Sequence, residues 1–168
     1  FPPAEPIAGR IACILDTVEP PRHTRILHLL RLRAGAVGRF DWQRATALLE
    51  QKHLPLSKPW LTLSKVQKRW VLAVLALAGG AELLILDEPA AGMNPQETKA
   101  LMALIKQIRD DGNTIFLIEH DMRVVFSIAT RIFVLYQGRL LAEGSPDDIR
   151  HDETVREAYL GGSDDVAG

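Results

Sequence analysis

Two apolar runs in this sequence end in polar side chains that could do chemistry. The run 83–86 is followed directly by Asp87 and Glu88, and the run 114–118 is followed by a polar cluster that contains His120. Carboxylates at the end of an apolar strand are costly unless they bind something, so the pattern predicts a cation site. One carboxylate suits Mg²⁺, and the next could orient an attacking water. Asp87 alone is equally compatible with a simple turn former, whereas its combination with His120 favours a site.

The elements that must position these side chains begin near residue 80. Short apolar runs predict strands over 83–86, 114–118 and 132–136, and Gln137-Gly138 predicts a hairpin turn into 139–143. Asn94-Pro95-Gln96-Glu97 is typical of a helix start, with Asn94 as the N-cap. Strands that alternate with crossover helices indicate a mostly parallel α/β sheet, whose ligands bind outside the carboxyl ends of the strands. We therefore expect Asp87, Glu88 and His120 to lie along one edge of that sheet.

The chain before residue 80 has a different, helical pattern. Residues 41–53 and 64–79 read as helices, with Asp41 as N-cap of the first and Trp42, Ala45, Leu48 and Leu49 on one face. Residues 26–33 are compatible with either helix or strand, and residues 54–63 read as a connector. The Pro-rich stretch 1–24 and helical fragments at 146–150 and 152–160 complete the outline, and we expect a loose tail from Gly161.

Composition limits the class of protein. The chain has 168 residues, 47% of them hydrophobic and 24% charged, which excludes a disordered or fibrous chain and allows a proper core. The single cysteine, Cys13, excludes a disulfide framework. The longest apolar run, 70–81, is too short to cross a bilayer, and the start Phe1-Pro2-Pro3 shows no leader sequence. These features predict a soluble intracellular protein.

The charge is unevenly distributed along the chain. Residues 1–70 hold 12 Lys or Arg against 5 Asp or Glu, a net charge of +7, and residues 71–168 have a net charge of −8. A basic half suggests an anionic partner such as nucleic acid, a phosphate or a lipid surface. The alternative, which we favour because no aromatic residues interleave with the basic ones, is a solvated helical face. Its members are Arg22, Arg25, Arg31, Arg33, Arg39 and Arg44.

The segments around the two strand ends resemble a known family. LLILDEPAAGMNPQET (83–98), TIFLIEHDMRVV (114–125) and EAYLGG (157–162) closely resemble the ATP-binding subunit of ABC transporters, of the branched-chain amino acid importer type. The similarity is strong over about 60–162 and weak over 41–59. It implies a P-loop NTPase-like parallel α/β sheet with flanking helices, incomplete here and preceded by a helical segment.

The resemblance also implies a role for each matching residue. Asp87 corresponds to the magnesium ligand, Glu88 to the catalytic base and His120 to the switch histidine that contacts the γ-phosphate. The D-loop, a segment that communicates with the second cassette of a dimer, corresponds to Gly92, Met93 and Asn94. Contacts to ATP are expected from Ser64, Gln67 and Asn94, with Mg²⁺ as the metal. The implied partners are transmembrane permease subunits and a second ATPase cassette, without nucleic acid, at the cytoplasmic face of the inner membrane.

The sequence departs from the family's pattern at three places where the family binds ATP. The sequence contains no G-x-x-x-x-G-K-[ST] loop, which holds the ATP phosphates in the family and lies upstream of everything matched here. The signature, L-S-x-G-Q in the family, reads Leu63-Ser64-Lys65-Val66-Gln67, so a β-branched side chain replaces the glycine. Asp16 stands where the family has its Q-loop glutamine. An incomplete sheet should also expose apolar edges and faces.

Two hypotheses follow. In the first, the chain is a C-terminal part or remnant of an ABC transporter ATPase that energises uptake of branched-chain amino acids, and is inactive alone. In the second, it is a non-catalytic pseudo-ATPase or interaction module that retains the fold. Under the first, we expect residues 1–60 to be an N-terminal, helical-subdomain-like segment. Residues 61–162 would be the C-terminal part of the ATPase domain, and 163–168 a loose tail.

Overall fold

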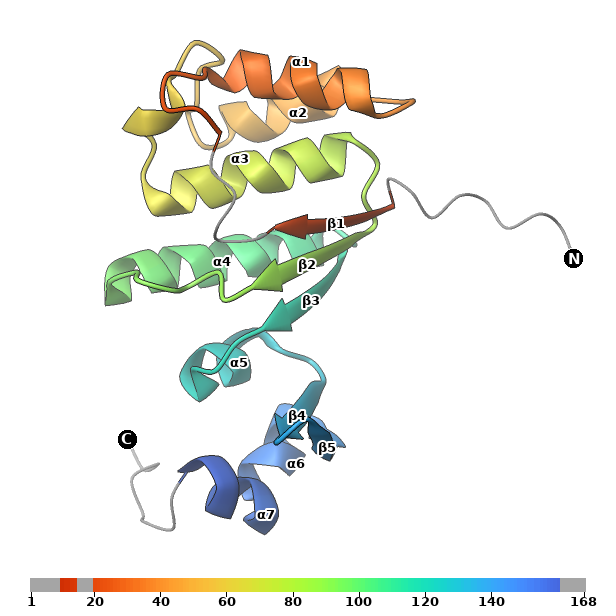
Figure 1. Ribbon diagram of the computed structural model, residues 1–168, viewed down its shortest axis with the longest axis vertical. Coiled ribbons are helices and arrows are strands. Elements are labelled where there is room, and N and C mark those ends of the chain that lie inside the picture. The colour runs from red at the N-terminus through yellow and green to blue at the C-terminus, as the bar shows by residue number, and fades with distance from the viewer. Residues whose placement is uncertain (1–9, 15–19, 161–168) are drawn as a thin grey trace, which may run out of the picture. The chain divides into compact units, whose positions relative to one another are not determined.

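The computed structural model describes residues 10–14 and 20–160, and its contacts divide the chain into two compact units (Figure 1). The first unit is Phe1–His120 and the second is Asp121–Gly168. Asp16 and the tail predicted from Gly161 lie outside the described residues. The first unit contains β1 (Ile11–Ile14), α1 (Ile26–Ala36), α2 (Trp42–Glu50), a 3₁₀ turn (Trp60–Thr62), α3 (Lys65–Ala78), β2 (Leu83–Asp87), α4 (Pro95–Asp110) and β3 (Thr114–Ile118).

The sheet of the first unit is parallel, as its sequence predicts. Its strands lie in the order β1-β2-β3, and both pairings are parallel. The strand predicted over 114–118 is confirmed, and the one over 83–86 extends through Asp87. Strand β1 falls in the stretch left unassigned, because a Pro-rich environment and only four strand residues gave too little periodicity to recognise.

One face of this sheet is covered and the other is open. The covered face contacts α3 and α4 and buries Ile14, Leu84 and Leu86, which are 5%, 0% and 6% exposed. On the opposite face Phe116 and Ile118 remain 50% and 46% exposed. Parallel sheets are almost always covered on both faces, so the open face agrees with the expectation of an incomplete sheet.

The predicted helices of the basic half are confirmed with small changes at their ends. Residues 26–33, open between helix and strand, form α1, and the helix predicted over 41–53 ends at Glu50. Asp41 caps α2 as expected, by accepting a hydrogen bond from the Arg44 amide at 2.8 Å. Trp42, at the start of the predicted face, is 40% exposed, and its ring packs edge-on against Phe40.

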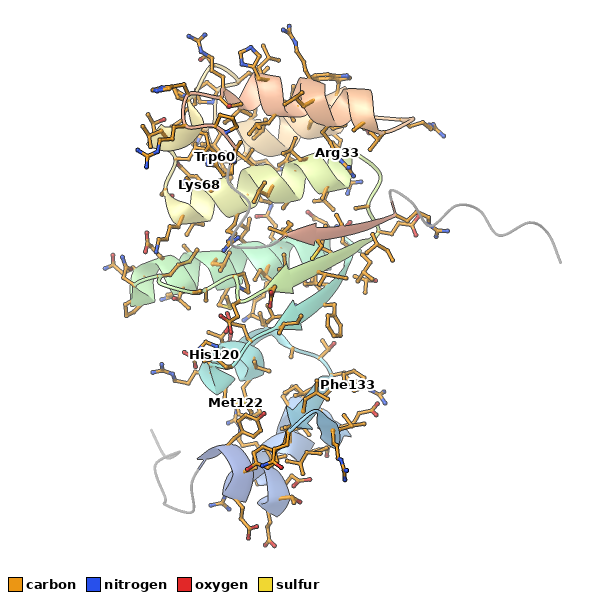
Figure 2. The ribbon with its side chains drawn as sticks, in the orientation of Figure 1. Arg33, Trp60, Lys68, His120, Met122 and Phe133 are labelled. Carbon is orange, nitrogen blue, oxygen red and sulfur yellow. The ribbon has the colours of Figure 1, made fainter. Side chains whose placement is uncertain are left out.

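Two buried tryptophans tie α3 to its surroundings. Trp70 lies on α3, is 1% exposed and donates its indole N–H to the Leu48 carbonyl at 2.9 Å. Leu48 is in the last turn of α2, where carbonyls lack donors within the helix, so the indole satisfies a group that would otherwise be orphaned. Trp60 is 2% exposed, and the Lys68 ammonium lies 5.4 Å from its ring centroid (Figure 2). Its indole N–H has no hydrogen-bond partner among the described residues.

The second unit is built around a β-hairpin. It contains α5 (Met122–Ile128), β4 (Ile132–Tyr136), β5 (Arg139–Gly144), α6 (Pro146–His151), α7 (Glu153–Val155) and a π-helical turn (Arg156–Leu160). Strands β4 and β5 pair antiparallel, which confirms the predicted hairpin. Its core consists of Ile132, Val134, Ile149 and Val155. Within the described residues of both units, no helix is long and apolar enough to cross a membrane.

We predict that Trp70→Phe lowers the free energy of unfolding by about 1–3 kcal/mol more than Trp60→Phe does. Both substitutions keep a ring and remove the same volume, but only the first leaves a buried carbonyl unpaired. The second removes a buried N–H that has no partner. Urea unfolding followed by far-UV circular dichroism measures both values. Equal losses would contradict the importance assigned to the hydrogen bond between Trp70 and Leu48.

We also predict that the two sheet faces respond differently to truncation. Leu84→Ala on the covered face should cost about 2–5 kcal/mol. Phe116→Ser on the open face should change the free energy of unfolding by less than about 1 kcal/mol and reduce self-association, because it removes exposed apolar surface. Urea unfolding and sedimentation velocity test this pair, and a large loss of stability in Phe116→Ser would show that the face is covered in solution.

Candidate functional site

The register between β2 and β3 brings the two polar clusters together. Asp87 pairs with Ile118, and the Glu88 amide continues the ladder by donating to the Ile118 carbonyl at 2.9 Å. Both strands therefore end at the same edge of the sheet, with their carboxyl ends side by side. The expectation that Asp87, Glu88 and His120 lie along one edge is confirmed.

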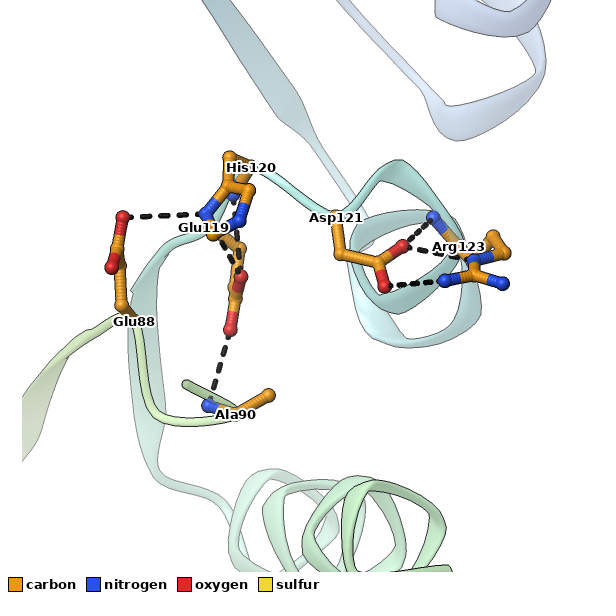
Figure 3. A network of polar contacts seen from close by, with 6 residues as sticks. All are labelled: Glu88, Ala90, Glu119, His120, Asp121 and Arg123. Atoms are coloured by element: carbon orange, nitrogen blue, oxygen red, sulfur yellow. Dashed lines mark hydrogen bonds and ion pairs between the residues drawn. The ribbon is translucent and has the colours of Figure 1, made fainter. Parts of the chain in front are cut away.

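At this edge His120 faces Glu88 across the strand ends (Figure 3). The Nδ1 atom of His120 lies 3.3 Å from Oε1 of Glu88. The two side chains are 75% and 52% exposed, so water screens their interaction. Exposed pairs of this kind contribute little to stability, at most about 1 kcal/mol. The contact is consequently weak enough to open when another group arrives between the two side chains.

The backbone at Glu88 is strained. Its φ is +40°, a left-handed value that residues with a side chain seldom adopt. The conformation is held on both sides, because the Glu88 amide is bonded to β3 and the next residue, Pro89, is fully buried. The strain turns the chain out of the strand direction at the point where the carboxylate meets His120. Such outliers gather at functional sites.

A second carboxylate, that of Glu119, connects the loops after the two strands. Its side chain is only 2% exposed, and Oε1 accepts a hydrogen bond from the Ala90 amide at 3.2 Å. The other oxygen, Oε2, accepts from the His120 amide at 3.2 Å (Figure 3). Glu119 thus fixes the turn after Glu88 and the backbone of His120 through one rigid group.

The following residue, Asp121, begins the second unit and caps α5. Its carboxylate accepts hydrogen bonds from the amide and the guanidinium of Arg123, at 2.9–3.2 Å (Figure 3). The side-chain hydrogen bond from Arg123 is the main reason that the pKa of Asp121 lies below its usual value. Asp121 therefore stays ionised in its role as a helix cap.

The three residues expected to contact nucleotide all belong to helix-capping pairs in this structure. Ser64 caps α3 by a reciprocal pair of hydrogen bonds with Gln67, in which each side chain accepts from the other residue's amide at 3.2 Å. Asn94 caps α4 in the same way with Glu97. The structure therefore places Ser64 and Gln67 at the start of α3 and Asn94 at the start of α4.

A lysine links these two helix starts. The Lys65 ammonium donates a hydrogen bond to the carbonyl of Gly92, which lies in the loop between β2 and α4. Gly92 has a φ of +64°, and a Cβ there would lie 3.0 Å from the Lys65 nitrogen, so the glycine serves both the turn and the close approach. The altered signature segment is thus connected to the loop that carries Asn94.

The donor set at the strand ends fits a magnesium ion only in its usual form, in which few ligands come from the protein. Among residues 10–14 and 20–160, no group of three or more His, Cys, Asp or Glu could hold a metal ion. Mg²⁺ commonly takes one or two carboxylates and completes its shell with water and substrate phosphates. Asp87, partly exposed at the end of β2, can supply that single carboxylate.

The sequence identified Glu88 and His120 but assigned no role to two residues that hold the neighbouring loops, Glu119 and Lys65. Glu119 was visible as an acid next to His120, yet only the structure shows that its side chain is buried. Lys65 stands at the position that the family's signature leaves unspecified, so its residue type gave no indication of its contact with Gly92.

Relatives of known description match this chain over part of their length. The model of the branched-chain amino acid ATP-binding cassette transporter family matches residues 139–165. The high-affinity branched-chain amino acid transport ATP-binding protein LivG of Salmonella typhimurium is 56% identical over 81 residues, which are 48% of this chain and 32% of LivG. The corresponding protein BraF of Pseudomonas aeruginosa is 46% identical over 101 residues, 60% of this chain and 40% of BraF.

The comparison with solved structures agrees with these sequence matches. The solved structure of an ATP binding subunit of an ABC transporter is 29% identical, superposes with a TM-score of 0.69, and is matched over 90% of this chain and 65% of its own. The chain spans only about a third of the length of LivG. The predicted resemblance is thereby confirmed: this chain is similar to the C-terminal part of the ATP-binding subunits of ABC transporters, of the branched-chain amino acid type.

Proposed function

We propose that this chain is the C-terminal part of an ATP-binding subunit that energises branched-chain amino acid uptake. The observation that carries the proposal is the contact between His120 and Glu88, 3.3 Å apart at the carboxyl edge of β2 and β3, beside Asp87. Similarity to LivG and BraF, both named as branched-chain amino acid transport ATP-binding proteins, supplies the substrate class. Residues 61–162 are the part that we assign to the ATPase domain.

In this proposal each residue of the edge has a distinct task. Asp87 would hold Mg²⁺, which when bound neutralises charge on the phosphates of ATP. Glu88 would orient the attacking water and accept its proton, and His120 would donate a hydrogen bond to the terminal phosphate. The exposure of Glu88 and His120 supports these tasks, since both must be reachable by ligand. Their weak mutual contact would be exchanged for contacts to water and phosphate.

The residues at the helix starts would act on nucleotide held by a second cassette. Ser64 and Gln67 begin α3, so the helix N-terminus and the Ser64 hydroxyl could face a phosphate, as Asn94 could at the start of α4. Val66 is half-buried and limits how closely the backbone can approach there. We infer that permease subunits and a second ATPase cassette are the partners, at the cytoplasmic face of the membrane, and that nucleic acid is not.

A specific observation favours a second candidate, a pseudo-ATPase or interaction module. The sequence has no P-loop and replaces the signature glycine with Val66, so the phosphate-binding side of the site is altered while the carboxylate side is intact. The coding sequence immediately before the codon for Phe1 distinguishes the two. An in-frame P-loop supports the ATPase proposal, and its absence supports the non-catalytic module.

We predict that the purified chain does not turn over ATP above background. Positioning and charge stabilisation provide nearly all of the catalysis in phosphoryl transfer, and losing one such donor costs roughly 100- to 1000-fold in rate. Without a P-loop several donors are lacking, so Val66→Gly should restore nothing. The assay compares phosphate release by the chain and by Glu88→Gln. Turnover that disappears in Glu88→Gln would show that this chain hydrolyses ATP by itself.

We further predict that Glu119 controls the backbone on which His120 depends. Glu119→Ala removes the acceptor of the Ala90 and His120 amides, so both amides should exchange hydrogen faster. Glu119→Gln keeps one acceptor oxygen, so only one of the two amides should lose protection. Amide hydrogen exchange measured by NMR tests this, with Glu82→Gln on the exposed surface as the control. Unchanged protection in Glu119→Ala would contradict the assigned role.

A further inference from the structure

Three arginines of the basic half converge on a pocket in the first unit. The cavity has a volume of about 750 Å³ and is lined by the end of α1, the start of α2 and the turn between α3 and β2. Arg33, Arg39 and Arg44 line it, together with Arg10 and a single acid, Asp41. The sequence interpretation of six arginines on one helical face is therefore wrong, because they come from the segment before α1, from α1, from α2 and from the loop between the two helices.

Arg33 is seated against a glycine. A Cβ on Gly79 would lie 2.9 Å from Nε of Arg33 and 3.2 Å from Nη2, so any larger residue there would force the guanidinium to shift. Neither Arg33 nor Arg39 forms an ion pair in the part of the chain that the structure describes. Among the described residues, two guanidinium groups thus border the pocket without a counter-charge.

The other charged side chains at the pocket already form ion pairs or hydrogen bonds. Arg10 pairs with Glu82 at 2.5 Å, and Arg44 reaches the Leu77 carbonyl at 3.5 Å. Asp41 accepts the Arg44 amide as the cap of α2. Setting the Arg10–Glu82 pair aside, three arginines against Asp41 leave a formal charge of +2.

Helix ends account for only part of this charge. The C-termini of α1 and α3 contribute about −0.5 each, and the N-terminus of α2 about +0.5, which leaves roughly +1.5. A basic residue at each C-terminus would suffice for capping, so the excess positive charge is free to attract an anion. A phosphate group carries about −1.5 to −2 at neutral pH and matches the planar donor fork of arginine.

We propose that this pocket binds a phosphate group, with Arg33, Arg39 and Arg44 as its ligands and the Gly79-Gly80 turn as its floor. The pocket belongs to the helical layer of the first unit and uses none of the residues assigned to ATP hydrolysis. The phosphate could belong to a free phosphorylated molecule or to the headgroup of an anionic lipid. An acidic protein segment is the competing kind of partner.

The test is a titration of the full chain with inorganic phosphate at constant ionic strength, followed by the backbone amide signals of Gly79 and Gly80. We expect saturable shifts, with affinity about tenfold weaker in Arg33→Gln and in Arg39→Gln, since each loses charge-assisted hydrogen bonds. Arg31→Gln removes the same charge from the exposed surface of α1, outside the pocket, and should leave the affinity unchanged. Gly79→Ala keeps every charge but displaces the Arg33 guanidinium, and should also weaken binding.

Co-sedimentation with vesicles distinguishes the two sources of phosphate. Binding to phosphatidylglycerol vesicles but not to phosphatidylcholine vesicles, lost in Arg33→Gln, identifies a lipid headgroup. Phosphate binding without vesicle binding identifies a soluble ligand. The proposal is overturned if neither probe binds, if Arg31→Gln weakens binding as much as Arg33→Gln, or if a polyglutamate peptide produces larger shifts than phosphate. Retained phosphate binding in Asp87→Asn separates this site from the proposed ATPase site.

Discussion

Parallel pairing between β2 and β3 is the constraint on which the rest of this site depends. Each strand supplies one polar cluster, and only a parallel register places the two clusters at the same edge. The hydrogen bond from the Glu88 amide to Ile118 extends this register by one residue and holds Glu88 in a strained backbone conformation. Buried Glu119 then joins the two loops. A one-residue slip in register would break all of these contacts together.

Several hydrogen bonds support the residues at the strand ends, whereas the sheet that carries them is covered on only one face. Helices α3 and α4 bury one face, while Phe116 and Ile118 on the other remain exposed. The same asymmetry exists in the sequence, where the carboxylates and His120 are present and no P-loop is found. Structure and sequence thus agree that Asp87, Glu88 and His120 can be brought to one edge of the sheet in a chain without a P-loop motif.

The sequence predicted correctly those elements whose structure is determined by a short local pattern. The apolar run 114–118 and the Asn94–Glu97 capping box specify a strand and a helix start by themselves, so both were found. It failed where the outcome depends on distant residues. Strand β1 needs β2 as its partner, and Arg33 reaches its pocket because Gly79 lies next to it in space.

The central claim is that a divalent cation and ATP phosphates meet at the carboxyl edge of β2 and β3. Paramagnetic broadening of backbone amide signals by Mn²⁺ in the presence of ATP measures this directly, since Mn²⁺ accepts the same oxygen ligands as Mg²⁺. Glu88 and His120 should broaden first, at lower Mn²⁺ with ATP than without it, and Asp87→Asn should abolish the effect. Broadening that is centred elsewhere, or that persists in Asp87→Asn, would contradict the account.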